Sequence, residues 1–142
     1  LGLLETRIDG FVANDPDRGF VDRSGRAQAQ APKWQFRVGA ELALLQHAYL
    51  RVEYEGKDAY YLSDSDDQKT DAFGLLHLGA GWRGESLEVG AWVRNALDKD
   101  YAVHGFYFGN DPRKFYANEP YWQFGPPRVA GVSVTYHIER GK

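Results

Sequence analysis

The chain has 142 residues, about the length of one domain, and 43% of them are hydrophobic. It contains no cysteine, which excludes disulfides, thiolate zinc sites and cysteine nucleophiles. The net charge of −3 offers no electrostatic basis for wrapping a phosphate backbone, so we expect no nucleic-acid partner. Aromatic residues make up 15% and glycine occurs 16 times, a combination that favours strands and tight turns over helices.

Six segments show the alternation of apolar and polar side chains that is typical of β-strands. They are residues 3–11, 33–44, 48–57, 72–82, 87–97 and 128–138. The clearest alternation gives one face to Trp34, Phe36, Val38, Ala40, Leu42 and Leu44. Residues 45–47 and 83–86 are short enough for hairpin turns, so we expect the strands that they join to be antiparallel neighbours.

The connections between the predicted strands alternate between long and short. The long ones are residues 12–32, 62–69 and 98–126, and all three fall at the same end of an up-and-down sheet. Short turns at one rim and long loops at the other are typical of outer-membrane barrels. The predicted fold class is therefore all-β, an antiparallel up-and-down meander of about six long strands.

Six strands of this length are too few to close a barrel, because about eight is the smallest common number. We therefore expect a sector of a larger transmembrane β-barrel, whose apolar face meets outer-membrane lipid. Aromatic residues near the predicted strand ends suit interfacial girdles, with Trp34, Tyr60 and Tyr61 towards the long loops and Trp82 and Tyr136 towards the short turns. The alternative is a small complete β-barrel or sandwich that binds an apolar ligand or has a structural role.

Two motifs near the C-terminus resemble those of a known family. The first is Asn95-Ala96-Leu97-Asp98-Lys99-Asp100-Tyr101, and the second runs from Gly125-Pro126-Pro127-Arg128 to Tyr136. Together they resemble the C-terminal end of TonB-dependent outer-membrane receptors, which close with a similar stretch, a final extracellular loop and a last strand. Residues 23–34 also look like a loop-to-strand passage of that family. One departure is that Ile138 is followed by Glu139-Arg140-Gly141-Lys142, where the family usually ends on an aromatic residue.

The resemblance implies that residues 1–142 are the C-terminal part of a 22-stranded barrel with a plugged lumen. Its plug and the segment that contacts TonB would belong to a preceding N-terminal part. The implied function is active transport of a scarce solute, most often a ferric siderophore, across the outer membrane of a Gram-negative bacterium.

Enzyme activity is not expected, because the serines lack a nucleophile-elbow context and the four histidines are scattered along the chain. We therefore predict no catalytic residue, no metal site and no cofactor. Asp64, Asp66 and Asp67 resemble a calcium loop superficially, but the required glycine and closing glutamate are missing. A solvated loop tip is the favoured interpretation of these three residues.

The last long loop is rich in aromatic residues and is the most promising region for ligand binding. Its candidate ligand-binding residues are Tyr107, Arg113 and Tyr121: aromatic faces can stack on flat groups, and Arg113 with Lys114 offers cations to an anionic ferric complex. The alternative is that these aromatics pack the loop down or line the bilayer interface.

Overall fold

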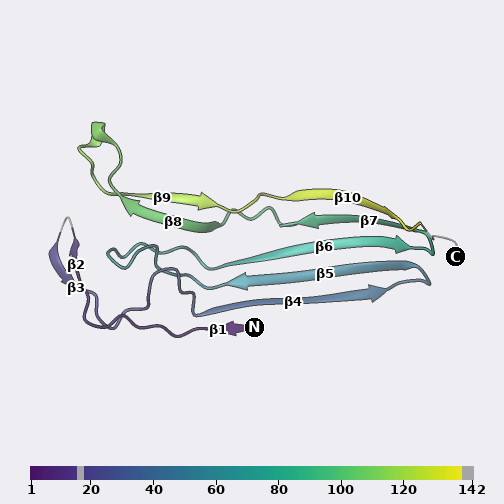
Figure 1. Cartoon of the computed structure of the whole chain (residues 1–142), viewed down its shortest axis with the longest axis horizontal. Coiled ribbons are helices and arrows are strands. Elements are labelled where there is room, and N and C mark those ends of the chain that lie inside the picture. The colour runs from purple at the N-terminus through teal and green to yellow at the C-terminus, as the bar shows by residue number, and fades with distance from the viewer. Residues whose placement is uncertain (16–17, 139–142) are drawn as a thin grey trace. The chain divides into compact units, whose positions relative to one another are not determined.

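The computed structural model describes residues 1–15 and 18–138, so the tail at residues 139–142 lies outside the described residues. Ten strands and one short 3-10 helix make up its regular structure (Figure 1). They are β1 (Gly2–Leu3), β2 (Val12–Asp15), β3 (Gly19–Asp22), β4 (Trp34–Ala43), β5 (Ala48–Lys57), β6 (Phe73–Arg83), β7 (Leu87–Arg94), β8 (Ala102–Phe108), η1 (Pro112–Lys114), β9 (Glu119–Phe124) and β10 (Val129–Tyr136). In the part of the chain that the structure describes, no helix is long and apolar enough to cross a membrane.

The residues group into two compact units, which are described separately. Unit 1 comprises residues 1–36, 56–73 and 100–125, and unit 2 comprises residues 37–55, 74–99 and 126–142.

A six-stranded sheet carries the meander, with the order β1-β4-β5-β6-β7-β10. The long strands run side by side in alternating directions (Figure 1). Strand β10 pairs antiparallel with β7 along its whole length, from Val129 opposite Arg94 to Tyr136 opposite Leu87. The predicted antiparallel meander is therefore confirmed.

The polar face of the sheet in unit 2 is held by cross-strand ion pairs. Arg83 lies 2.6 Å from Glu41 and 3.1 Å from Glu88, and Arg37 lies 2.9 Å from Glu55. Arg37, Glu41, Glu55 and Glu88 lie at polar positions of the predicted alternation, whereas Arg83 falls in the segment predicted as a turn.

Glycines on the polar face make room for large side chains of neighbouring strands. A side chain at Gly81 would meet the Tyr49 hydroxyl at 2.6 Å, and one at Gly131 would collide with the Trp92 ring. Glycine therefore lets Tyr49 and Trp92 lie flat across the sheet instead of projecting from it.

The apolar face of unit 2 is open. The exposed fractions are 61% for Val38, 73% for Val132 and 66% for Val134, although each lies in the middle part of a long strand. A complete sandwich would bury these side chains beneath a second sheet. The exposure of these valines is what we expect of a surface that faces an apolar environment outside the chain.

Three expectations about the rest of the chain were wrong. The first predicted strand, residues 3–11, is reduced to the two residues of β1, because Gly10 takes a positive φ of 62° and residues 4–8 bond irregularly to the loop that follows β3. Two long connections contain strands of their own, in the hairpins β2–β3 and β8–β9. Tyr60 does not belong to an interfacial girdle, because it is 3% exposed and its hydroxyl donates to the Val103 carbonyl at 2.7 Å.

Candidate functional site

The side chains of Asn95 and Asp98 form hydrogen bonds that hold together the two ends of the last long connection, where it leaves and re-enters unit 2. The Asn95 amide donates to the carbonyls of Lys99, at 2.9 Å, and Pro126, at 3.3 Å. The Asp98 carboxylate accepts from the backbone N–H of Arg128 at 2.8 Å. Asn95 is only 2% exposed and has a φ of 48°, a conformation that asparagine tolerates better than most residues. The two C-terminal motifs thus meet at the base of this loop.

Unit 1 has a small core beneath the β8–β9 hairpin. Its buried hydrophobic residues include Ala13, Tyr60 and Leu62. Leu62 lies so close to Gly105 of β8 that an added Cβ there would stand 2.9 Å from the leucine. The hairpin is therefore anchored on the segment that follows β5.

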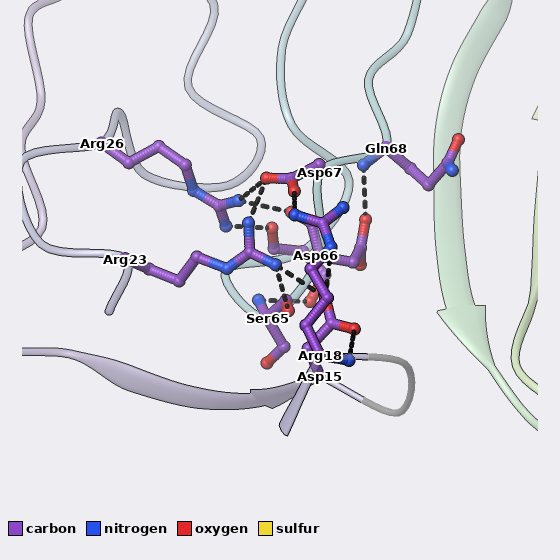
Figure 2. Close-up of polar contacts among 9 residues, drawn as sticks. Asp15, Arg18, Arg23, Arg26, Ser65, Asp66, Asp67 and Gln68 are labelled. Atoms are coloured by element: carbon purple, nitrogen blue, oxygen red, sulfur yellow. Dashed lines mark hydrogen bonds and ion pairs between the residues drawn. The ribbon is translucent and has the colours of Figure 1, made fainter. Parts of the chain in front are cut away.

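An ionic cluster in unit 1 joins residues 15–26 to the loop at residues 63–67 (Figure 2). The buried Arg23 guanidinium binds the Asp67 carboxylate and lies 3.1 Å from the Asp15 carboxylate. Arg18 approaches Asp67 to 3.3 Å. Arg26 donates to the Ser63 carbonyl at 2.9 Å and also pairs with Asp67 at 3.2 Å.

The carboxylates of this cluster differ in their acidity. The hydrogen bond from Arg23 holds the pKa of Asp67 below its usual range and raises the pKa of Arg23 itself. Burial has the opposite effect on Asp66, whose pKa is raised because the charged form loses water.

The interpretation of Asp64, Asp66 and Asp67 as a solvated loop tip was right only in part: the Asp67 side chain is 46% exposed, but Asp66 is buried. Asp66 is 7% exposed, Asp67 is shared by three arginines, and Asp64 accepts from the Ala29 N–H at 2.6 Å. The described residues contain no group of three or more histidines, cysteines or carboxylates arranged to hold a metal ion.

Tyr107, the first predicted ligand residue, lines a polar cavity of about 220 Å³ in unit 1. Its walls come from the β2–β3 hairpin, the loop at residues 65–68 and the β8–β9 connection. The other residues that line it are Asn14, Asp15, Arg18, Ser65, Asp66, Asp67, Gln68 and Asn118. Polar groups therefore converge beside the Tyr107 ring.

Tyr121, another predicted residue, lies on the opposite face of the same hairpin. It stands across from Phe106 in the ladder, whereas Tyr107 stands across from Pro120. Its ring is 4.9 Å from that of Phe108, in an aromatic row that includes His104 and Phe106. The Tyr121 hydroxyl donates to Glu119 at 2.8 Å, which raises the pKa of the tyrosine.

Arg113, the third predicted residue, sits in η1 at the tip of the connection and its side chain is 87% exposed. It pairs with Asp111 at 3.0 Å, and this hydrogen bond raises the pKa of Arg113. Lys114 pairs with Glu119 at 2.5 Å. Both cations offered for an anionic ligand thus have intramolecular partners, and the three predicted residues do not converge on one point.

Sequence reasoning missed the ionic cluster and the polar cavity. The arginines lie at residues 18–26 and the acidic run at residues 64–67, about forty positions further on. A partial signal was present, because residues 62–69 hold three aspartates against one lysine, whereas residues 12–32 hold three arginines and three aspartates. Nothing in the sequence alone fixes which loops meet.

No family model matches this chain, and no curated protein matches it. Among solved structures, the chain is similar to the siderophore receptor PiuA from Acinetobacter baumannii, with a TM-score of 0.68 at 12% sequence identity. The similarity covers 88% of this chain and 17% of the receptor chain, so this chain spans about a sixth of that receptor. The likeness at this low identity shows the fold: an all-β antiparallel meander, consistent with a sector of a receptor barrel.

Proposed function

We propose that this chain is the C-terminal part of the barrel of a TonB-dependent outer-membrane receptor that imports a scarce solute, with a ferric siderophore as the first candidate. In this proposal the protein resides in the outer membrane of a Gram-negative bacterium and uses a plug and TonB through a preceding part. The open apolar face of the long-stranded sheet is the observation that carries it. The likeness to PiuA supports it at the level of the fold.

The chemical difference between the two faces of unit 2 supports a lipid-facing wall. Val38, Val132 and Val134 leave the apolar face exposed, and the opposite face carries the Arg83, Glu41 and Glu88 network. Strands of transmembrane barrels alternate in this way, with apolar side chains towards lipid and polar ones towards the lumen. A soluble protein rarely leaves such a contiguous apolar surface uncovered.

Three long connections at one end of the sheet support a solute-binding role. They hold the ionic cluster, the polar cavity beside Tyr107 and the aromatic row that includes Tyr121. Loops carried on a rigid scaffold are the usual place for recognition residues. We propose Tyr107 as a ligand contact within the cavity, Tyr121 as a contact on the opposite face of the hairpin, and Arg113 as a contact at its tip.

A gene deletion tests the proposed function. The deletion strain should lose growth on one ferric siderophore as the sole iron source, and its uptake of radioactive iron from that siderophore should fall to background. A tonB deletion should give the same phenotype, and cell fractionation should place the protein in the outer membrane. Recovery of the protein in the soluble fraction, or unchanged growth on every ferric siderophore supplied, would contradict the proposal.

A further inference from the structure

His77 lies on the polar face of β6 in unit 2 and reaches the base of the last long connection. Its side chain is 14% exposed, and its Nδ1 atom accepts a hydrogen bond from the backbone N–H of Asn95 at 3.2 Å. The next N–H of the chain, that of Ala96, donates to the Leu76 carbonyl at 2.8 Å. The imidazole therefore adds one side-chain bond to the backbone pairing of β6, just after β7 ends at Arg94.

The hydrogen bond from Asn95 defines the protonation state of this ring. A backbone N–H can only donate, so the Nδ1 atom of His77 has to present a lone pair. The imidazole is therefore neutral and carries its proton on Nε2. That nitrogen is buried and makes no hydrogen bond within residues 1–15 and 18–138, but the Oε1 atom of Glu55 lies 3.4 Å from it. A carboxylate is thus within ion-pair distance of the ring.

Asn95 is the residue through which the bond to His77 acts on the connection. Its side-chain amide donates to the carbonyls of Lys99 and Pro126, and its side-chain oxygen accepts from the N–H of Lys99 at 2.9 Å. Its φ of 48° lies in the left-handed region, which a residue other than glycine keeps only where its surroundings hold it. The bond to His77 is one of those restraints, so its loss would loosen both ends of the connection together.

Charged residues lie around His77 on β4, β5, β7 and the start of the last connection. They are Arg37, Glu53, Glu55, Arg94, Asp98 and Lys99. Glu55 turns its Oε2 atom to Arg37, at 2.9 Å, and its Oε1 atom to His77. Asp98 pairs with Arg128 at 3.6 Å, and the Arg94 guanidinium carbon lies 5.2 Å from the Trp92 ring centroid. A charged imidazole would therefore have a carboxylate on one side and a hydrogen-bond donor, the Asn95 N–H, on the other.

From this geometry we propose that His77 is a proton-sensitive latch on the last long connection. The neutral ring accepts from Asn95 and fastens the base of the loop. A proton added at Nδ1 occupies the lone pair, so the Asn95 N–H then faces a second donor and the hydrogen bond is lost. The charged ring pairs with Glu55 instead, and a buried N–H without a partner weakens the folded arrangement around Asn95.

Acid should therefore loosen the connection at its base, because histidine is the side chain that ordinarily takes up a proton between pH 8 and pH 5. The latch goes beyond the proposed function and does not depend on it, since it concerns only how unit 2 holds the loop.

Hydrogen exchange of the full-length protein at pH 8 and pH 5, followed by mass spectrometry, tests the latch. The protection factors of residues 95–99, which are corrected for the pH dependence of intrinsic exchange, should fall about tenfold from pH 8 to pH 5. His77→Asn puts an amide oxygen, which accepts but does not take up a proton, near the place of Nδ1. This variant should keep its protection at both pH values. His77→Phe has no acceptor and should show low protection at both.

His47→Asn is the matched control, because His47 is another histidine of unit 2 and its Nδ1 atom lies 2.9 Å from the Arg83 carbonyl instead. It should respond to acid as the unchanged protein does. Equal protection at both pH values in the unchanged protein would overturn the proposal. So would a His77→Asn variant that still loses protection in acid, because the carboxylates elsewhere in the chain remain in that variant. Either result leaves the transport proposal standing, since uptake and cell fractionation test that proposal separately.

Discussion

Replacing Val132 by arginine probes the apolar face where its burial in lipid should be deepest. Strand β10 has eight residues, which at about 3.3 Å per residue gives a length of about 26 Å. A tilt of about 40° reduces its height to about 20 Å, close to the apolar band of about 25 Å in outer-membrane barrels. Val132 is the fourth residue of the strand, so the proposed lipid-facing wall would place it near the bilayer midplane.

An arginine at such a position should lower the free energy of unfolding by about 2–4 kcal/mol. Thr135→Arg is the comparison on the polar face, because Thr135 stands opposite Glu88, which already pairs with Arg83. Its effect should stay below about 1 kcal/mol. The free energies of unfolding of both variants are measured by urea unfolding of the full-length protein in lipid vesicles, followed by tryptophan fluorescence. Equal losses in the two variants, or a larger loss for Thr135→Arg, would refute the assignment of the faces.

Three further predictions concern the loops and their anchors. Asn95→Ala should cost about 2–4 kcal/mol of stability, measured by urea unfolding, because it removes three hydrogen bonds at a buried site. The depressed pKa of Asp67 means that its carboxylate stabilises the folded loops above the ordinary aspartate range and that this stability is lost as pH falls through the lowered pKa. The hydrogen-exchange protection factors of unit 1, which are corrected for the pH dependence of intrinsic exchange, should therefore fall at acidic pH, and Asp67→Asn should flatten that dependence. Tyr107→Phe should weaken uptake of the solute through its KM more than Tyr121→Phe does, because Tyr107 lines a polar cavity and the Tyr121 hydroxyl is already bonded to Glu119.

Each of these has a control or an opposite outcome. Asn110→Ala removes an exposed asparagine from the same long connection and should leave stability unchanged, so an equal loss there would speak against the Asn95 clamp. Protection factors in unit 1 that do not change at acidic pH would contradict the role of the Asp67 pairs. Uptake that depends on Tyr121 but not on Tyr107 would place the ligand at the aromatic row of Tyr121, on the other face of the hairpin.

The long strands were predictable because alternation is a local property. Strands β4, β5, β6, β7 and β10 lie within about three residues of their predicted bounds, since each keeps one apolar and one polar face along its length. The short turns then fixed their antiparallel order. The same logic failed for residues 3–11, whose weak alternation competes with the turn conformation of Gly10.

The loops were less predictable because their structure depends on contacts between distant segments. Tyr60 looked like an interfacial residue, but its hydroxyl bonds to Val103, more than forty residues away. The Arg23 and Asp67 pair likewise joins two different loops. Composition showed that the last loop was aromatic, and only the register of β8 and β9 showed that Tyr107 and Tyr121 face opposite ways.

Spin labels at Val134 and Thr135 test the central claim most directly. The two residues are neighbours on β10 with side chains on opposite faces, and the chain has no cysteine, so Val134→Cys and Thr135→Cys each add one labelling site within it. In vesicles, the Val134 label should collide with molecular oxygen, which concentrates in hydrocarbon, and the Thr135 label with a water-soluble nickel complex. The account would be contradicted by a Val134 label that neither oxygen nor the nickel complex can reach, in a protein that stays folded in solution without lipid. In that result the Thr135 label would still be open to water.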